Sequence, residues 1–481
     1  MQFESYDNNE NTIFSMTFWR ITTVYGVGFI CLRAISFLLL PFYTNLLSKH
    51  DVGWVFIIYT ILAFLNVLYT HGMNAALFKF FHSSKKKEII TTSNLYSVFY
   101  SVGLSLFLFL GYVLYISITN NIPSYDIVII ILVIASLDMV SSRNSSLLRL
   151  LERPYYYLFV CFINVVLSIA FNIYFIQICH LGLLGAINAL LYVSIIQFLL
   201  LLPIMFSYFS ITCFNKELLY KMLRFGIAFF PAALFFVLIE MSDRWMLGYL
   251  RNINDVGLYG AGYKIGSVVL LLVNSFNLNW QPFYLKRGLD KGVAVFENIG
   301  QHFLLILIFI ATILSILWPI IFQWRFGSFY LIGMAFWKGG NIIPIICLSY
   351  IFYGLFILQM PSIYLKTKQN WAPIFWGSGF FINMLANCLL IPRFGIYGAA
   401  YATLLAYFTM SMMLIYKNQS WLPIKYQCNK LIPFIMLSAT TYLGTQLLFL
   451  QKHILFIVAL YIMGSLCYIY YTSKNIILKL D

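Results

Sequence analysis

Residues 299–322 have the sequence IGQHFLLILIFIATILSILWPIIF, which contains no Asp, Glu, Lys or Arg. A helix needs about 20 mostly apolar residues to cross the hydrocarbon core of a bilayer, so this stretch is long enough to span one. Inside lipid, a backbone must satisfy its own hydrogen bonds, which favours a helix over an open sheet. The stretch therefore predicts a transmembrane helix.

The rest of the chain repeats this pattern. Its 481 residues are 62% hydrophobic and only 9% charged, whereas a soluble domain carries about 25% charged residues. We therefore predict an all-α polytopic membrane protein with about 14 transmembrane helices, whose ends are uncertain by about 4 residues. The candidate runs are 17–40, 53–72, 93–118, 126–148, 156–178, 183–208, 223–246, 257–284, 299–322, 340–365, 371–391, 396–416, 430–450 and 454–473.

The placement of the 30 basic residues predicts the orientation. Nineteen lie in or at the edges of alternate connections and the C-terminal tail, six in the other connections, and five deeper within the apolar runs. Because Lys and Arg accumulate in cytoplasmic loops, both termini are expected on the cytoplasmic side. The first dozen residues carry three acids and no Lys or Arg, so no cleaved signal peptide is expected. The basic residues are spread over short loops, which excludes nucleic-acid binding despite the net charge of +15.

Two motifs recur in the same order along the chain. Asp51-Val52-Gly53 recurs 204 residues later as Asp255-Val256-Gly257, and Gly182-Leu183-Leu184-Gly185-Ala186 recurs 213 residues later as Gly395-Ile396-Tyr397-Gly398-Ala399. Six helices separate equivalent positions, so the two halves have the same orientation in the membrane. We expect an N-lobe over residues 1–213, a C-lobe over 214–417, and helices 13 and 14 with a cytoplasmic tail over 418–481.

Several further segments carry a family resemblance. They are Arg224-Phe225-Gly226 leading to Pro231, Ser242-Asp243-Arg244-Trp245, Asp255-Val256-Gly257-Leu258-Tyr259, Tyr263-Lys264-Ile265, Trp280-Gln281-Pro282-Phe283 and Leu389-Leu390-Ile391-Pro392. As an ordered set they resemble the polysaccharide-export branch of the multidrug/oligosaccharidyl-lipid/polysaccharide exporter superfamily. That branch contains the flippases for lipid-linked O-antigen and capsule repeat units.

The resemblance implies two six-helix lobes around a central cavity, two extra helices and transport by alternating access. It also implies a polyprenyl-pyrophosphate-linked oligosaccharide as substrate, in the bacterial inner membrane, within O-antigen or lipopolysaccharide synthesis. Other polysaccharide assembly proteins would be natural partners, beside the membrane lipid itself. No cofactor and no enzymatic activity are expected.

Charged residues at membrane depth are the candidate site, because a charge in hydrocarbon is costly. The basic ones are Arg20, Arg33, Arg143, Arg244 and Lys264, and the acidic ones are Asp138, Glu240 and Asp243. Their formal sum of +2 would attract an anion into a cavity of low dielectric constant. Arginine suits phosphate because its planar fork makes paired, charge-assisted hydrogen bonds. We therefore select Arg33, Arg143, Arg244 and Lys264 as substrate-binding residues.

Other roles stay open for each of these residues. Arg20 could reach the membrane interface, Arg33 could pair with a carboxylate on another helix, and Arg143 could contact lipid headgroups. Glu240 and Arg244 are four residues apart on one helix face, so with Lys264 they could form an ion-paired triad or a coupling site. Asp138 is a second candidate for coupling or ion pairing. It lies about 140° around the helix from Arg143, so the two should not face each other.

Two other function classes compete with a flippase. A multidrug/cation antiporter of the same superfamily would need an acidic cavity, but the first apolar run carries two arginines and no acid. A membrane polymerase or acyltransferase would need a large loop or a His/Asp constellation. The six histidines are scattered without metal-ligand spacing, which disfavours this class.

Overall fold

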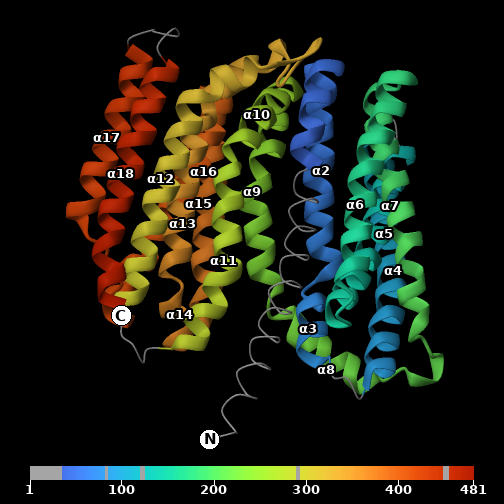
Figure 1. Cartoon of the computed structure of the whole chain (residues 1–481). Helices are drawn as coiled ribbons and strands as arrows, with labels where there is room; N and C mark the ends of the chain where they lie inside the picture. The colour runs from blue at the N-terminus through green and yellow to red at the C-terminus, as the bar shows by residue number, and fades with distance from the viewer. Residues whose placement is uncertain (1–34, 82–84, 120–124, 289–292, 448–453, 481) are drawn as a thin grey trace, which may run out of the picture. The chain divides into compact units, whose positions relative to one another are not determined.

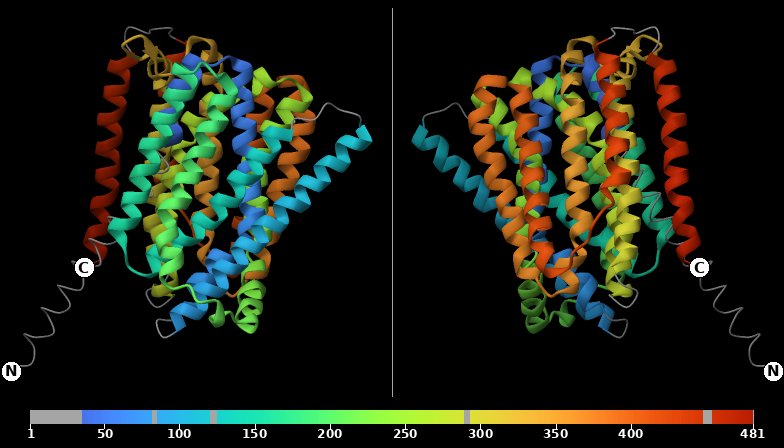
Figure 2. Two further views of the ribbon diagram at one scale, coloured as in Figure 1. Left: turned by 90° about the vertical axis from the view of Figure 1, so that its right-hand side faces the viewer. Right: turned by 90° about the vertical axis from the view of Figure 1, so that its left-hand side faces the viewer.

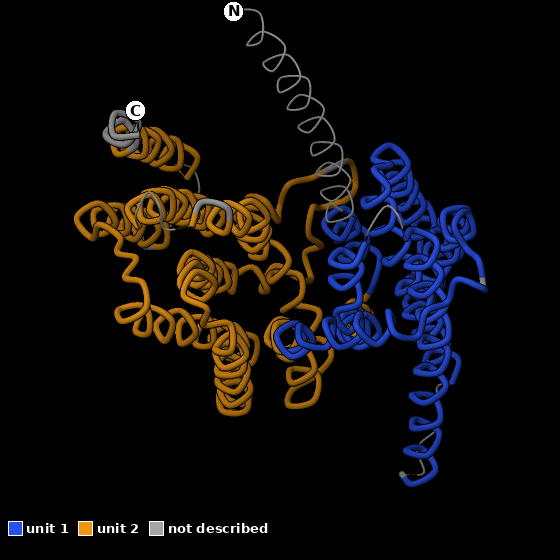
Figure 3. The backbone as a smooth tube through the Cα atoms, turned by 90° about the horizontal axis from the view of Figure 1, so that it is seen from below, with its two compact units in different colours: residues 1–47, 58–234 blue, residues 48–57, 235–481 orange. Residues whose placement is uncertain are grey.

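Long helices dominate the computed structural model, which describes residues 35–81, 85–119, 125–288, 293–447 and 454–480 (Figure 1). The chain divides into two compact units (Figure 3). Unit 1 comprises residues 1–47 and 58–234, and unit 2 comprises residues 48–57 and 235–481. The first turns of α2 thus belong to unit 2, although the rest of α2 belongs to unit 1.

Unit 1 is a helical bundle. Its elements are a helix over Ile35–Leu46, then α2 (Lys49–Thr70), α3 (Met73–Phe80), α4 (Lys86–Thr119), α5 (Tyr125–Leu150), α6 (Pro154–Asn172), the π-helix η2 (Ile173–Ile178), α7 (Gly182–Ser207), the short η3 (Ile211–Cys213) and α8 (Lys216–Ile227). Its core joins α2, α5 and α7 through Ile58, Tyr69, Leu132, Met139 and Ile187. The C-terminal half of α4, cyan in Figure 2, diverges from the other helices of this unit.

Unit 2 is a larger helical bundle. Its elements are α9 (Phe230–Leu250), α10 (Ile253–Gly266), α11 (Val268–Arg287), α12 (Ala294–Gln323), the strands β1 (Arg325–Phe326) and β2 (Phe329–Tyr330), η4 (Met334–Ile342), α13 (Ile343–Gln359), α14 (Pro361–Leu365), η5 (Gln369–Trp371), α15 (Ala372–Phe394), α16 (Ile396–Trp421), α17 (Cys428–Leu447) and α18 (Ile454–Leu480). The strands form a two-residue antiparallel hairpin with Arg325 opposite Tyr330. α17 and α18 pack beside α12 (Figure 1).

The helices expose apolar surface as a bilayer requires. Phe107 and Ile118 on α4 are each 73% exposed, and large apolar side chains are exposed on most other helices. Ten of the described helices are long and apolar enough to cross a membrane, or up to twelve if each of two bent pairs is one span. The all-α polytopic fold is confirmed. Of the 14 predicted runs, 17–40 lies mostly outside the described residues, and 430–450 corresponds to α17, which is not among these spans.

Two predicted runs are broken in the structure. The run 223–246 divides into α8 and α9, which are bent by 44°, and the run 257–284 divides into α10 and α11, bent by 46°. The first break has a clear cause, since Pro231 lacks the N–H that would continue a helix and instead occupies the first turn of α9. At the second break, the Ser267 hydroxyl donates to the carbonyl of Lys264 at 2.7 Å.

The two copies of the Asp-Val-Gly motif meet inside unit 2. A Cβ atom on Gly53 would lie 2.1 Å from the carbonyl oxygen of Ile253, and one on Gly257 would lie 2.5 Å from the carbonyl oxygen of Lys49. The two glycines are 204 residues apart in sequence, and so are the two residues whose carbonyls they approach, Lys49 and Ile253. The contact between α2 and α10 is therefore related by a pseudo-twofold axis, as two homologous halves would produce.

The second repeated motif also has matching geometry. Gly182 and Gly395 share φ of 55°, a left-handed conformation that glycine adopts without a steric penalty. Gly185 and Gly398 each approach a carbonyl of the preceding helical segment, so that a Cβ would lie 3.0 Å from Phe175 O and 2.3 Å from Leu390 O respectively. The two motifs thus share a glycine with positive φ and a close approach to the preceding helix, although the carbonyls approached lie 10 and 8 residues upstream.

The glycine contact between α2 and α10 predicts a strong size limit. Gly53→Ala and Gly257→Ala should each lower the stability of the purified protein, by about 1–3 kcal/mol, because the new methyl group meets backbone that cannot move aside. Gly103→Ala on α4 is the matched control, since nothing lies within 4 Å of its Cβ position. Thermal unfolding in detergent measures all three, and equal midpoints would contradict the contact.

Candidate functional site

Arg143 is the most unusual charged residue of unit 1. It lies on α5, is 0% exposed, and donates from Nη1 to the carbonyl oxygen of Ser93 on α4 at 2.9 Å. Its Nε and Nη2 atoms have no hydrogen-bond partner in the part of the chain that the structure describes. Among the described residues no carboxylate lies within ion-pair distance of the guanidinium. A buried, uncompensated cation with two vacant donors is therefore built into this bundle.

A polar chain lies beside Arg143. The carbonyl of Tyr69 can only accept a hydrogen bond, so the His71 Nδ1 atom that contacts it at 2.9 Å must carry the proton. His71 Nε2 then accepts from the Tyr96 hydroxyl at 2.9 Å. These groups donate to one another and leave the guanidinium donors vacant.

Asp138 lies on the same helix as Arg143 but has a different environment. Its Oδ1 atom accepts a hydrogen bond from the Ser194 hydroxyl of α7 at 2.8 Å. Arg143 instead reaches α4. The two residues thus have separate partners on different helices, as their spacing along α5 predicts.

Glu240 of α9 is held by three tyrosines of unit 2. Its carboxylate accepts from the hydroxyls of Tyr263 at 2.8 Å and Tyr350 at 2.9 Å, and from that of Tyr407. The Tyr350 hydroxyl also contacts that of Tyr263 at 2.5 Å. The side chains come from α10, α13 and α16, and Glu240 is buried. We call Glu240 with these three phenols the tyrosine cage.

Arg244 pairs with Asp243 and not with the Glu240 carboxylate. Its Nη1 atom lies 3.4 Å from Asp243 Oδ1 and donates to the main-chain oxygen of Glu240 at 2.7 Å. The guanidinium also lies over the Tyr263 ring, 4.3 Å from its centroid. Asp243 accepts a further hydrogen bond from the Tyr259 hydroxyl. With both carboxylates ionised, Glu240, Asp243 and Arg244 carry a formal charge of −1.

The structure distributes the selected residues over both units. Arg143 and Asp138 belong to unit 1, and Glu240, Arg244 and Lys264 belong to unit 2, where Lys264 follows Tyr263 on α10 and is half-buried. Arg33 and Arg20 lie outside the described residues. The headgroup alternative for Arg143 does not fit a side chain without exposed surface.

The tyrosine cage was not predicted from the sequence. Tyr350 and Tyr407 are 110 and 167 residues from Glu240, so no local pattern joins them. Tyr259 and Tyr263 offered a weak signal, because their spacing of four places both phenols on one face of α10.

Comparisons with known proteins give one family and one fold. Residues 18–283 match the model of a family described as polysaccharide biosynthesis protein. No curated protein matches the sequence. A structure of the lipid II flippase MurJ in an inward closed conformation is similar, with 12% identity, 95% of this chain and 99% of that chain covered, and a TM-score of 0.67.

Transporters of a second kind share the fold. An inward-facing multidrug resistance MATE family transporter of the MOP superfamily is 12% identical over 80% of this chain and 97% of its own, with a TM-score of 0.58. A mutant of the Vibrio cholerae MATE transporter VcmN is 13% identical over 83% of this chain and 96% of its own, with a TM-score of 0.56. At these identities the likenesses establish the fold alone.

The two buried arginines should respond oppositely to removal of their charge. Arg143→Met eliminates an unpaired buried cation and should leave the thermal midpoint unchanged or raise it. Arg244→Met strands Asp243 without its partner and should cost about 3–5 kcal/mol. Thermal unfolding of the purified variants compares them, and a large loss of stability in Arg143→Met would show that the guanidinium has a structural counterion.

Proposed function

Because the chain belongs to the polysaccharide biosynthesis protein family, whose model covers more than half of its residues, we propose that it is a flippase for a lipid-linked oligosaccharide. The substrate is an O-antigen or capsule repeat unit joined through pyrophosphate to polyprenol. Its headgroup passes from the cytoplasmic to the outer leaflet of the bacterial inner membrane, while the lipid tail stays in the bilayer. The fold shared with a lipid II flippase supports transport over catalysis.

The observation that carries this proposal is the vacant guanidinium of Arg143. A cation buried without a carboxylate raises the free energy of the resting protein, so it is retained for a ligand that supplies the negative charge. Nε and Nη2 lie on one edge of the guanidinium, where they can donate two parallel hydrogen bonds to two oxygens of a phosphate. We propose that Arg143, Arg33 and Lys264 meet the pyrophosphate in turn during alternating access. Arg244 contributes less directly to substrate binding, because its guanidinium is already paired with Asp243.

Two homologous halves support alternating access. The matched glycine contacts at offsets of 204 and 213 residues support an N-lobe over 1–213 and a C-lobe over 214–417, with 418–481 appended. The distribution of Lys and Arg supports cytoplasmic termini. Access then alternates by movement of one lobe against the other around a fixed substrate site.

We assign ion coupling to the tyrosine cage. The net charge of −1 on Glu240, Asp243 and Arg244 would be cancelled by one proton or one small cation. Three phenols from three helices surround the carboxylate, so its protonation would weaken contacts between α9, α10, α13 and α16 together. Asp138, bonded to Ser194, is the corresponding acid of unit 1.

Arg33 provides the direct test of the substrate class. In cells that lack the gene, a polyprenyl-pyrophosphate-linked oligosaccharide should accumulate on the cytoplasmic side, and the wild-type gene should restore its export. Arg33→Ala should abolish export at matched expression. Arg33→Lys should retain part of it, because lysine keeps the charge and loses the bidentate fork. Full export with Arg33→Ala would remove this residue from the site, and no accumulation would exclude the substrate class.

A multidrug/cation antiporter is the second candidate, and the MATE likenesses together with the acidic tyrosine cage favour it. It predicts uptake of a cationic dye into inverted vesicles, driven by an ion gradient and lost in Glu240→Gln. The flippase proposal predicts no protein-dependent dye uptake in wild-type vesicles. Dye fluorescence distinguishes the two, with vesicles lacking the protein as the control.

A further inference from the structure

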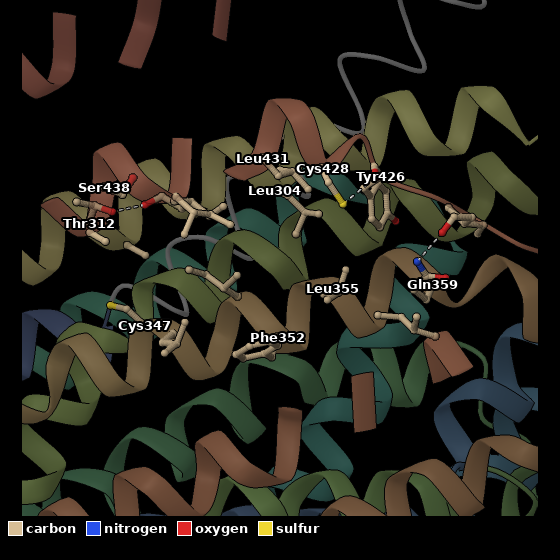
Figure 4. Close-up of a pocket in the computed structure, with 18 of the residues that line it drawn as sticks. Leu304, Thr312, Cys347, Phe352, Leu355, Gln359, Tyr426, Cys428, Leu431 and Ser438 are labelled. Carbon is tan, nitrogen blue, oxygen red and sulfur yellow. Dashed lines mark hydrogen bonds between the residues drawn. The ribbon is translucent and has the colours of Figure 1, made fainter. Parts of the chain in front are cut away.

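A deep apolar groove runs along one side of unit 2. Its volume is about 900 Å³, and its walls come from α12, α13, α16, α17 and the connector 422–427 (Figure 4). Leu304, Phe352, Leu355 and Leu431 are typical of the lining. The groove is lined along α13 from Pro344 to Gln359, a rise of about 22 Å at about 1.5 Å per residue.

Three hydroxyl side chains in the apolar part of the groove donate to carbonyls of the helices that carry them. The hydroxyls of Thr312 and Ser315 donate to the carbonyls of Ile308 and Ala311, at 2.8 and 2.7 Å. Ser438 donates to the carbonyl of Phe434 at 2.9 Å. These bonds use the donors of Thr312, Ser315 and Ser438 within their own helices, so this part of the groove is suited to hydrocarbon.

One end of the groove is polar and firmly built. The connector 422–427 closes this end and is held by three side chains from two helices, α12 and α13. Gln359 donates to Ile424 O at 3.2 Å, and Gln301 accepts from Gln427 N at 2.7 Å. Glu297 accepts from the main-chain N–H of Lys425 at 2.8 Å. This end therefore exists before any ligand arrives, which lowers the entropic cost of binding.

Asn418 adds a vacant acceptor at this polar end. It is 2% exposed, and its Nδ2 atom donates to both the main-chain oxygen and Oε1 of Gln359, at 3.0 and 2.7 Å. Because both atoms of Gln359 are acceptors, the Asn418 amide must turn its nitrogen toward them. The Oδ1 atom of Asn418 then has no partner among the described residues. Asn418 and Lys425 both line the groove. The polar end thus offers a cation and a buried acceptor to the head of an amphiphile.

Cations and indoles pair at the C-terminal end of α16, next in sequence to Asn418 and the connector. Lys417 lies 4.7 Å from the centre of the Trp371 ring, and Lys368 lies 6.0 Å from the centre of the Trp421 ring. The ring centroids of the two indoles are 5.4 Å apart. Tryptophan and lysine gather at the headgroup level of a membrane, where basic residues attract anionic lipid.

We infer that this groove binds one anionic glycerophospholipid from the membrane, with its acyl chains in the groove, its phosphate at Lys425 and a headgroup hydroxyl donating to Asn418. One leaflet of hydrocarbon is about 15 Å deep, half of the roughly 30 Å core, so an acyl chain fits within the groove. A polyprenyl tail is far longer than the groove. The inference goes beyond the flippase proposal and depends only on the protein being embedded in a membrane.

Lipid binding to the purified protein tests the inference. Dioleoyl phosphatidylglycerol, added to the delipidated protein in detergent, should remain bound in native mass spectrometry and raise the thermal midpoint more than dioleoyl phosphatidylcholine does. Lys425→Gln should weaken phosphatidylglycerol binding about fivefold, the effect of one basic residue near a lipid phosphate, and weaken phosphatidylcholine binding less, because the choline ammonium offsets the phosphate charge. Lys366→Gln, an exposed lysine outside the lining, should bind like the wild type.

A second pair of variants tests the apolar part. Ala439 lines the groove on α17, and Met436 on the same helix is exposed and outside the lining. Ala439→Phe should weaken phosphatidylglycerol binding about tenfold, as expected when two methylene groups are displaced. Met436→Phe should have no effect, and the lipid-free midpoints of both variants establish that they are folded.

Three results would overturn the inference. The first is that phosphatidylglycerol and phosphatidylcholine bind equally well and that Lys425→Gln changes neither affinity. The second is equal binding by Ala439→Phe and Met436→Phe. The third is displacement of phosphatidylglycerol by undecaprenyl phosphate at a lower concentration, which would assign the groove to a prenyl tail.

Discussion

The cost of an uncompensated charge in hydrocarbon is the constraint on which this structure depends. In unit 2 the constraint is met more closely, since Asp243 pairs with Arg244 and three phenols donate to Glu240. In unit 1 it is met only in part, because Arg143 makes one hydrogen bond and has no carboxylate partner among the described residues. A protein under selection for stability alone would replace such an arginine with an apolar side chain. Its presence therefore points to a ligand.

The repeat explains how both halves obtain close helix packing in lipid. Without a hydrophobic driving force between helices, association depends on close backbone approach at small residues. Gly53 with Gly257, and Gly185 with Gly398, supply this approach at equivalent positions. Gly185 and Gly398 thus repeat one kind of close approach in the two proposed lobes, whereas Gly53 and Gly257 share the single contact between α2 and α10.

Much of the fold could be predicted from the sequence, because apolar runs of about 20 residues are a local signal. The bends between α8 and α9 and between α10 and α11 were harder to predict. Pro231 marks the start of α9 within an apolar run, and the second break falls at Gly266-Ser267, a Gly/Ser pair that is a weaker signal than proline. The residues of the candidate site were selected by charge and depth alone, and their role in binding stays a prediction. Charged residues within apolar runs can be identified directly from the sequence. The partners of Glu240 and Arg143 cannot, because they come from other helices. Asp243 as partner of Arg244 was missed, since adjacent residues on a helix do not usually face each other.

The most direct measurement of the central account is translocation by the purified protein in proteoliposomes. One substrate is the oligosaccharide linked through pyrophosphate to polyprenol, and the comparison substrate is the same glycan on a neutral lipid. The account predicts protein-dependent movement of the pyrophosphate-linked substrate across the bilayer and little movement of the neutral one. Equal rates for both would contradict it, because the buried positive charge would then have no part in recognition.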